Sequence, residues 1–322
     1  MKILATGGTG FFGRHLVPLL RQAGHAVTAP SSSDADLRRP DALAPWRDER
    51  FDAIVHLAAW TRAGTFCRTH GGEQWRVQQT LDRRALDFWA DHQRDAVLVS
   101  FGTSVAHAPS RDLHREDAYL AGEPSAAYFG YAMAKRSLYA GARSLAAQHG
   151  MRSLHLVPST LYGPDYHLDG RPLHFVYDLA RKIARGVRFG EPVVLWGDGA
   201  QRRELVFVAD AARWVAALLE RAAGPRNAAF EALWAQDRAA GVVHLGAGDD
   251  ASIREIAERL CRLAGLPSER LTFDRDAFVG ARAKRLAVDR LDALWPDRPR
   301  TSLDDGLAAT MAWVDDHLEA LG

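Results

Sequence analysis

The chain has 322 residues, 47% of them hydrophobic, so it can bury a large core and is long for one domain but short for three. A formal net charge of +1 with no basic or acidic block argues against a nucleic acid as partner. Cys67 and Cys261 have neither the spacing of a disulfide framework nor that of a zinc site, and no metal is expected. No signal peptide and no apolar run of roughly 20 residues is seen, which predicts a cytoplasmic protein without membrane contact.

Strand and helix patterns alternate along the first half of the chain, which predicts a parallel, doubly wound α/β sheet. Short apolar runs that end in glycine or polar residues indicate buried parallel strands, and longer amphipathic runs indicate helices. The predicted strands are 2–6, 26–29, 53–59, 96–101 and 153–157. The predicted helices are 11–24, 73–92 and 132–150.

The first predicted strand runs into GGTGFFG, with Gly7, Gly10 and Gly13 three residues apart. Gly7 permits the tight turn, Gly10 lets the backbone approach a diphosphate, and Gly13 lets the helix pack on the sheet. Most glycine triplets are plain turns, but this one follows a strand and opens a helix. It predicts dinucleotide binding on a Rossmann-type fold.

After the second predicted strand the chain reads APSSSDADLRRP. An acidic residue directly after this strand would bind the ribose 2′-hydroxyl of NAD, whereas Ser31 and its neighbours carry no charge. Serine hydroxyls, with Arg14, Arg38 or Arg39 nearby, favour the 2′-phosphate of NADP. A plain polar loop is the alternative. The expected cofactor is therefore NAD(P), with NADP preferred.

Tyr131 and Lys135, in YAMAK, lie four residues apart on a predicted helix and so share a face. A free tyrosine has a pKa of about 10, and a neighbouring ammonium favours its ionised form. The pair suits proton transfer beside a nicotinamide, although a core tyrosine with a solvated lysine would give the same spacing. Tyr128 has Ala132 four residues later and lacks a matching lysine.

These motifs resemble those of the extended short-chain dehydrogenase/reductase family, the NAD-dependent epimerases and dehydratases that modify nucleotide sugars. The resemblance covers nearly the whole chain, and within the family it is nearest the GDP-fucose synthase-like branch. The similar segments are GGTGFFG, DLRRPDAL, HLAA, YAMAK, PSTLYGP, GDGAQRREL with VADAA, and RPRTSLDDGL. The cofactor-binding residues that the resemblance implies are Gly7, Gly10, Phe11, Phe12, Gly13, Ser31, Asp36, Leu37, Leu57, Ala58, Ala59, Tyr131, Lys135 and Pro158.

The resemblance also predicts two domains. Residues 1–163 would form the NAD(P)-binding Rossmann domain, to which segments around 204–222 and 242–250 return. Residues 164–322 would form mainly a smaller α/β substrate domain. Residues 222–241 fit either a loop or a helical insertion.

Thr103 matches the family's catalytic serine or threonine and would donate a hydrogen bond to the oxygen at the reacting carbon. Ser104, one residue later, is the alternative candidate. When His107 is aligned with the tyrosine that the family usually carries, Thr103 falls at the catalytic position. His174 matches a histidine that acts in proton transfer in GDP-fucose synthases. The predicted catalytic residues are thus Thr103, Tyr131, Lys135 and His174.

The two residues after Thr103 limit the reaction. Related dehydratases carry Asp-Glu there, and GDP-fucose synthases carry a cysteine where this chain has Val105; Ser104 and Val105 supply no acid or base for either reaction. A nucleotide-sugar C4-epimerase, acting through a transient 4-keto intermediate, is the preferred prediction. An NADPH-dependent 4-keto reductase is the alternative. A GDP-fucose synthase-type 3,5-epimerase/reductase and a non-catalytic cofactor-binding protein fit less well.

The substrate implied by the resemblance is a nucleotide-diphosphate sugar, either a hexose or a heptose. Its predicted contacts are Ser104, Val105, His174, Arg203 and Arg282. The arginines would bind the diphosphate. Family members commonly dimerise through two long helices, so a homodimer through Gln74–His92 and Ala132–His149 is expected.

Overall fold

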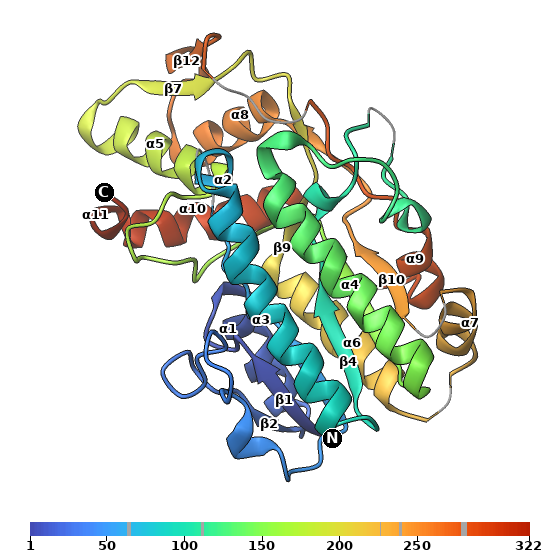
Figure 1. Cartoon of the computed structure of the whole chain (residues 1–322). Coiled ribbons are helices and arrows are strands. Elements are labelled where there is room, and N and C mark those ends of the chain that lie inside the picture. The colour runs from blue at the N-terminus through green and yellow to red at the C-terminus, as the bar shows by residue number, and fades with distance from the viewer. Residues whose placement is uncertain (63–65, 111–112, 226, 238–239, 278–281) are drawn as a thin grey trace.

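The protein is built on a parallel six-stranded sheet with strand order β10-β5-β4-β3-β1-β2 (Figure 1). The computed structural model describes residues 1–62, 66–110, 113–225, 227–237, 240–277 and 282–322. The strands of this sheet are β1 (Lys2–Thr6), β2 (Ala26–Thr28), β3 (Ala53–His56), β4 (Val97–Phe101), β5 (Ser153–Pro158) and β10 (Ala240–Leu245). The predicted parallel α/β sheet is thereby confirmed.

The strand order reverses at β1, because β2 pairs with one edge of this strand and β3 with the other. Thr6, the last residue of β1, is in register with His56, the last residue of β3. In open α/β sheets, ligands bind in the crevice outside the carboxyl ends of the strands at such a reversal. The glycine loop leaves β1 at this crevice.

Helices cover both faces of the sheet. Ile3 and Ala5 of β1 pack on the layer that holds α1 (Phe11–Gln22) and α6 (Val208–Ala223). Leu4, between them, packs on the opposite layer, where α3 (Gly71–His92) and α4 (Phe129–His149) run side by side (Figure 1). With both faces buried, successive strand residues are all apolar, as the sequence pattern indicated.

The second half of the chain adds a separate hydrophobic core. Its helices and strands pack on one another through buried residues such as Ile183, Leu260 and Val314. The elements here are α5 (Phe175–Phe189), β7 (Val193–Trp196), α8 (Ile253–Ala264), β12 (Leu271–Asp274), α10 (Leu303–Asp316) and α11 (Leu318–Leu321). α6 packs on the large sheet and β10 is its edge strand. The division into two domains, with later segments returning to the first, stays a prediction.

Short elements connect the two cores. β6 (Thr160–Tyr162) pairs in parallel with β9 (Leu205–Phe207), and β8 (Arg202–Arg203) pairs antiparallel with β11 (Ala251–Ser252). The remaining helices are α2 (Phe66–Thr69), α7 (Ala228–Gln236) and α9 (Asp289–Leu294). Of the two readings left open for 222–241, the described residues contain the helix α7. Throughout the described ranges, every helix is too short or too polar to cross a lipid bilayer.

Candidate active site

The glycine loop after β1 forms a cradle of bare backbone. A Cβ atom on Gly7, whose φ is +71°, would lie 2.5 Å from the Ala58 nitrogen, and one on Gly13 would lie 2.5 Å from the Gly8 oxygen. A Cβ on Gly10 would meet only the Gly7 oxygen, at 3.2 Å. No side chain caps α1 and its first turn has no acidic residue, so its amide groups are left for an anion. This cradle fits the diphosphate of a dinucleotide.

Four other predicted cofactor residues lie at the carboxyl ends of β3 and β5. Leu57, Ala58 and Ala59 directly follow β3, and Pro158 ends β5. Leu37 is buried in the core of the α3/α4 face. The side chains of Phe11 and Phe12 turn away into aromatic contacts with Tyr166 and Phe101, respectively. These two residues therefore offer the cradle their backbone amides rather than their rings.

The loop after β2 contains, beside the predicted Ser31, Asp36 and Arg38, a carboxylate at Asp34 that the sequence analysis did not consider. The Ser31 hydroxyl and amide donate to one carboxylate oxygen of Asp34, at 2.7 and 3.0 Å, and these bonds lower the pKa of Asp34. Asp36 accepts two hydrogen bonds from the Arg38 guanidinium at 2.8 Å. Beside them lies a pocket of about 250 Å³. Its lining residues are Arg38, Trp60, Glu73, Arg76, Val77 and Thr80.

Tyr131 and Lys135 lie in the first two turns of α4. Lys135 is 2% exposed, and its Nζ lies 6.0 Å from the centroid of the Tyr131 ring. The same Nζ lies 3.5 Å from Oδ1 of Asp82, a buried residue of α3. The sequence argument missed Asp82, although buried Gln74, Gln78 and Asp82 recur every four residues on α3. Polar residues at that spacing on one face of an amphipathic helix were the available signal.

Thr103 stands between β4 and the 3-10 turn Ser104–Ala106, which packs on α4. The Arg136 guanidinium holds this turn through a 2.8 Å hydrogen bond to the Ala106 oxygen. Gly102 passes so close to Tyr119 that a Cβ atom would lie 2.5 Å from the tyrosine hydroxyl. The position of Thr103 is thus fixed from both sides.

A pocket of about 280 Å³ opens beside this turn. It brings together three of the predicted substrate contacts, Ser104, Val105 and Arg282. Thr103, Tyr131, His174 and Arg203 are not among its lining residues. The full lining is Ser104, Val105, His107, Pro109, Ser110, His114, Ser125, Tyr128, Arg282, Ala283 and Lys284. Tyr128 and Lys284 were missed by the sequence argument, which dismissed Tyr128 for want of a lysine on its own helix.

Lys284 supplies a cation to Tyr128 from a distant part of the chain. Its Nζ lies 4.8 Å from the centroid of the Tyr128 ring. Burial, with the charge of Arg203 adding to it, lowers the pKa of Lys284 to about 7. Among the described residues, no carboxylate lies within ion-pair distance of this ammonium. Lys284 and the nearby Arg203 therefore favour an anionic ligand.

His174 is electrostatically coupled to Lys284 and Arg203. It caps the start of α5, and its Nδ1 is buried with no hydrogen-bond partner among the described residues. Burial, with the charges of Lys284 and Arg203 adding to it, lowers the pKa of His174 to about 4. At neutral pH the imidazole is uncharged, which leaves Nδ1 able to bond a ligand.

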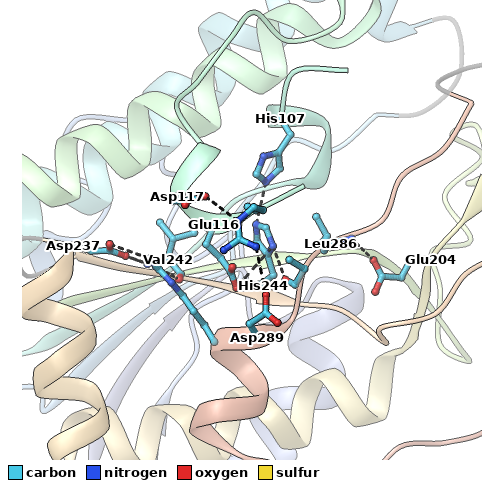
Figure 2. Close-up of polar contacts among 12 residues, drawn as sticks. His107, Glu116, Asp117, Glu204, Asp237, Val242, His244, Leu286 and Asp289 are labelled. Carbon is cyan, nitrogen blue, oxygen red and sulfur yellow. Dashed lines mark hydrogen bonds and ion pairs between the residues drawn. The ribbon is translucent and has the colours of Figure 1, made fainter. Parts of the chain in front are cut away.

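His107, which lines the pocket, contacts a second buried histidine, His244, as Figure 2 shows. The Nε2 atoms of His107 and His244 are 3.0 Å apart, and the Nδ1 of His244 donates to the Ala287 oxygen at 2.9 Å. His114 stacks on His107 with ring centroids 4.8 Å apart. Burial lowers the pKa of His107 to about 2 and that of His244 to about 3. The pocket floor formed by His107 and His114 is therefore neutral.

Glu204 fastens the segment that carries Lys284. Its two carboxylate oxygens accept hydrogen bonds of 2.9 Å from the Gly248 and Leu286 amides, the latter shown in Figure 2. Burial raises the pKa of Glu204 to about 7 against the opposing effect of these bonds. The residue next to the predicted phosphate-binding Arg203 thus supports the pocket wall.

Comparison with known proteins agrees with this geometry. The NAD dependent epimerase/dehydratase family matches residues 3–232. Two curated relatives are GDP-L-fucose synthases: that of Escherichia coli (strain K12) is 29% identical over 97% of this chain and 96% of its own, and that of Azorhizobium caulinodans is 27% identical over 96% and 95%.

Solved structures show the same fold over nearly the whole chain. A GDP-L-fucose synthetase from Naegleria fowleri bound to NADP has a TM-score of 0.83 at 21% identity, covering 99% of this chain and 93% of that one. A GDP-mannoheptose C4 reductase from Campylobacter jejuni with NADP bound has a TM-score of 0.81 at 20% identity, covering 97% of each. The chain belongs to the NAD-dependent epimerase/dehydratase family and is an NAD(P)-dependent enzyme of nucleotide-sugar metabolism.

Proposed function

We propose that the protein is an NADPH-dependent reductase of a 4-keto nucleotide sugar. The observation that carries this proposal is the pair Tyr131 and Lys135 on α4, the helix on which the Ser104–Ala106 turn of the pocket packs. Ser104 and Val105 line the pocket, and its described lining contains no carboxylate or thiol. Elimination of water and 3,5-epimerisation both need an additional acid and base. Reduction of a ketone needs one proton donor and one hydride donor.

Each residue has a defined part in that reaction. When bound at the glycine loop, NADPH would supply the hydride. The Tyr131 phenol donates its proton to the carbonyl oxygen as this oxygen becomes an alkoxide. Lys135 favours the tyrosinate that remains, and the Thr103 hydroxyl donates a hydrogen bond to the same oxygen. Ser104 is the second candidate for the Thr103 role because it lines the pocket.

We infer the substrate class from the cationic side chains at and near the pocket. Arg203, Arg282 and Lys284 suit the diphosphate, and neutral His174 suits a sugar hydroxyl or the keto oxygen. Curated relatives include GDP-L-fucose synthases and a dTDP-4-dehydro-6-deoxy-D-allose reductase from Streptomyces bikiniensis, the latter 25% identical over 98% of this chain. We therefore place GDP-linked and dTDP-linked 4-keto hexoses and heptoses first among the substrates to test.

A C4-epimerase is the second candidate, because Thr103, Tyr131 and Lys135 together with the cofactor suffice for that reaction as well. It would oxidise the 4-hydroxyl, let the 4-keto sugar turn, and return the hydride to the other face. The sequence argument preferred this reaction. We now place it second because five curated relatives that match over nearly the whole chain are named as synthases, a reductase and a dehydratase.

The test is to identify any cofactor released from the purified protein and then to supply a panel of nucleotide sugars. A strict need for NADPH and a keto sugar supports the reductase. Product formed without added reductant, with oxidised cofactor copurified, supports the epimerase instead. Tyr131→Phe should abolish turnover and retain cofactor binding. Tyr139→Phe, two turns further along α4 in the core, is the matched control.

The preference for NADP rests on Arg38 and Arg76, which line the pocket beside the β2 loop. Asp34, bound to Ser31, opposes it, because a carboxylate there suits a free ribose hydroxyl. Dissociation constants for NADPH and NADH measure the balance. Tighter binding of NADPH that is lost in Arg38→Ala supports the assignment, and equal or tighter binding of NADH contradicts it.

We also propose a homodimer through α3 and α4, the long helices that lie together on one face of the sheet (Figure 1). Trp75 on α3 and Phe129 on α4 are large apolar side chains that stay exposed in the single chain. Light scattering at micromolar concentration tests this, and a monomer would reject it.

A further inference from the structure

The Lys135 ammonium is enclosed by a buried network that the proposed reaction does not itself require. Asp82 Oδ1 lies 3.5 Å from Lys135 Nζ, and it also lies 3.0 Å from His56 Nε2 and accepts a 2.8 Å hydrogen bond from Gln78. His56 Nδ1 lies 2.8 Å from the Thr6 hydroxyl at the end of β1. The network thus joins two strands of the sheet, β1 and β3, to the two helices α3 and α4 around one carboxylate.

The network decides the charge on Asp82. Burial alone would raise the pKa of Asp82, but the Lys135 ammonium and the hydrogen bonds from His56 and Gln78 hold it below its ordinary value. Asp82 is 1% exposed, so its carboxylate and the ammonium depend on one another for stabilisation.

No other group around Lys135 can replace that negative charge. The titratable neighbours are His56 on β3, His155 on β5, Tyr119 and Tyr131. Burial lowers the pKa of His155 to about 3, with Lys135 adding to the effect, so His155 is neutral. Burial also raises the pKa of Tyr119, which keeps that phenol neutral. Within the described residues, Asp82 is the sole carboxylate at ion-pair distance from Lys135.

We propose that Asp82 is a positioning residue whose carboxylate keeps Lys135 charged and fixed beside Tyr131. The effect of Asp82 on catalysis rests on the proposed function, whereas the effect of Asp82 on Lys135 does not. A lysine enclosed at 2% exposure loses its proton readily when its counter-charge is removed. Tyr131 would then lose the cation that favours its ionised form.

The direct test is an NMR titration of protein labelled with ¹³C at the lysine ε-carbon, in the wild type and in Asp82→Asn. The chain has four lysines, so the spectrum is simple, and Lys135→Met assigns the signal. The lysines are Lys2, Lys135, Lys182 and Lys284. We expect Asp82→Asn to lower the pH at which Lys135 deprotonates by at least about one unit. An unchanged titration would overturn the proposal.

The pH profile of turnover gives the catalytic readout. In Asp82→Asn the loss of the neighbouring cation should move the limb of the profile that depends on the Tyr131 phenol to higher pH. Asp87→Asn, on the exposed face of the same helix where Asp87 pairs with Arg83, should leave the profile in place. A profile in Asp82→Asn that keeps its position, with only a lower melting temperature, would mean a structural role and reject the proposal. If the wild type turns over no nucleotide sugar, the proposed function fails while the NMR result stands.

Should Asp82→Asn not fold, a second pair of variants decides the matter. Lys135→Met leaves the Asp82 carboxylate without its cation, and Asp82→Asn/Lys135→Met removes both charges. The double variant should unfold at a higher urea concentration than Lys135→Met. An equal or lower midpoint would show that the two groups are not coupled and would overturn the proposal.

Discussion

His107, which lines the pocket, and the buried His244 point their Nε2 atoms at each other across 3.0 Å (Figure 2). Because Nδ1 of His244 donates to the Ala287 oxygen, Nε2 of His244 is the acceptor and Nε2 of His107 the donor. Protonation of His244 would set N–H against N–H between the two Nε2 atoms, whereas protonation of His107 would add a charge to a buried ring. Burial keeps both rings neutral in the folded protein.

This pairing predicts loss of stability in acid. The pKa values of both rings lie far below 6.5 in the folded state, so the unfolded chain takes up their protons first. Stability should fall as the pH drops below about 6.5, by up to about 1.4 kcal/mol per pH unit for each histidine. His107→Gln retains a donor to His244 and should remove one histidine's share of that slope in urea unfolding. His149→Gln, in the last turn of α4, is the control and should retain the wild-type slope.

Glu204 predicts the opposite dependence. Its pKa in the folded state, about 7, lies above its ordinary value because of burial. The stability associated with its proton is fully present below about pH 4.5 and is lost as the pH rises through about 7. Glu204→Gln should therefore gain stability relative to the wild type between pH 5 and pH 8, by up to about 3 kcal/mol over that window. The loss of one acceptor for the Gly248 or Leu286 amide adds a constant offset.

The measurement is urea unfolding of both proteins at several pH values. A difference in free energy that does not change with pH would mean that the wild-type carboxyl is already ionised at pH 5. Weaker binding of a nucleotide sugar to Glu204→Gln is expected as well, because Glu204 anchors the segment that carries Lys284.

The sequence predicted the parts of the fold that depend on local pattern. The alternating apolar strands, the glycine loop and the Tyr131–Lys135 spacing all come from residues near one another in the chain, and the predicted sheet is confirmed. Lys284 and Tyr128 meet from segments more than 150 residues apart, which no local spacing reveals. Asp82 was hidden because a carboxylate on a long helix normally faces solvent.

The choice between loop and helix at 222–241 could not be settled from sequence for a related reason. α7 is short, and Phe230, Leu233 and Trp234 become an apolar face only against the sheet and α6, to whose core they belong. A side-chain cap, in which Asn227 accepts from the Ala229 amide, starts the helix. Tertiary burial rather than helical propensity stabilises so short an element.

Replacing a glycine of the loop by alanine should have different effects at Gly13 and at Gly10. Gly13→Ala places a methyl group 2.5 Å from the Gly8 oxygen, so α1 must move away from the sheet. Gly10→Ala meets only the Gly7 oxygen at 3.2 Å and has an ordinary φ of −74°, so the fold should tolerate it. We expect Gly13→Ala to lower the melting temperature strongly. Gly10→Ala should melt near the wild type and bind NADPH at least about tenfold more weakly, because its methyl group points where the diphosphate approaches.

Fluorescence titration with NADPH and thermal unfolding separate the two outcomes. Equal loss of stability in both variants would contradict the assignment of Gly10 to cofactor approach. Unchanged NADPH binding in a folded Gly10→Ala would place the diphosphate elsewhere.

Val105 predicts what the pocket lacks for epimerisation. It lines the pocket together with Lys284, to which His174 is electrostatically coupled. A thiol with a pKa of about 8.5 is a few per cent ionised at neutral pH and can remove a proton from a carbon beside a ketone, whereas a valine side chain cannot. Val105→Cys should therefore exchange deuterium from D₂O into the carbons next to the keto group of a 4-keto nucleotide sugar, in the absence of NADPH. Val105→Ser, whose hydroxyl stays protonated, is the matched control, and the wild type should exchange none.

Exchange that disappears in Val105→Cys/His174→Asn would assign the second proton transfer to His174. Rapid exchange by the wild type itself would mean that another residue already acts as the base, and the reaction would then include epimerisation beside the ketone.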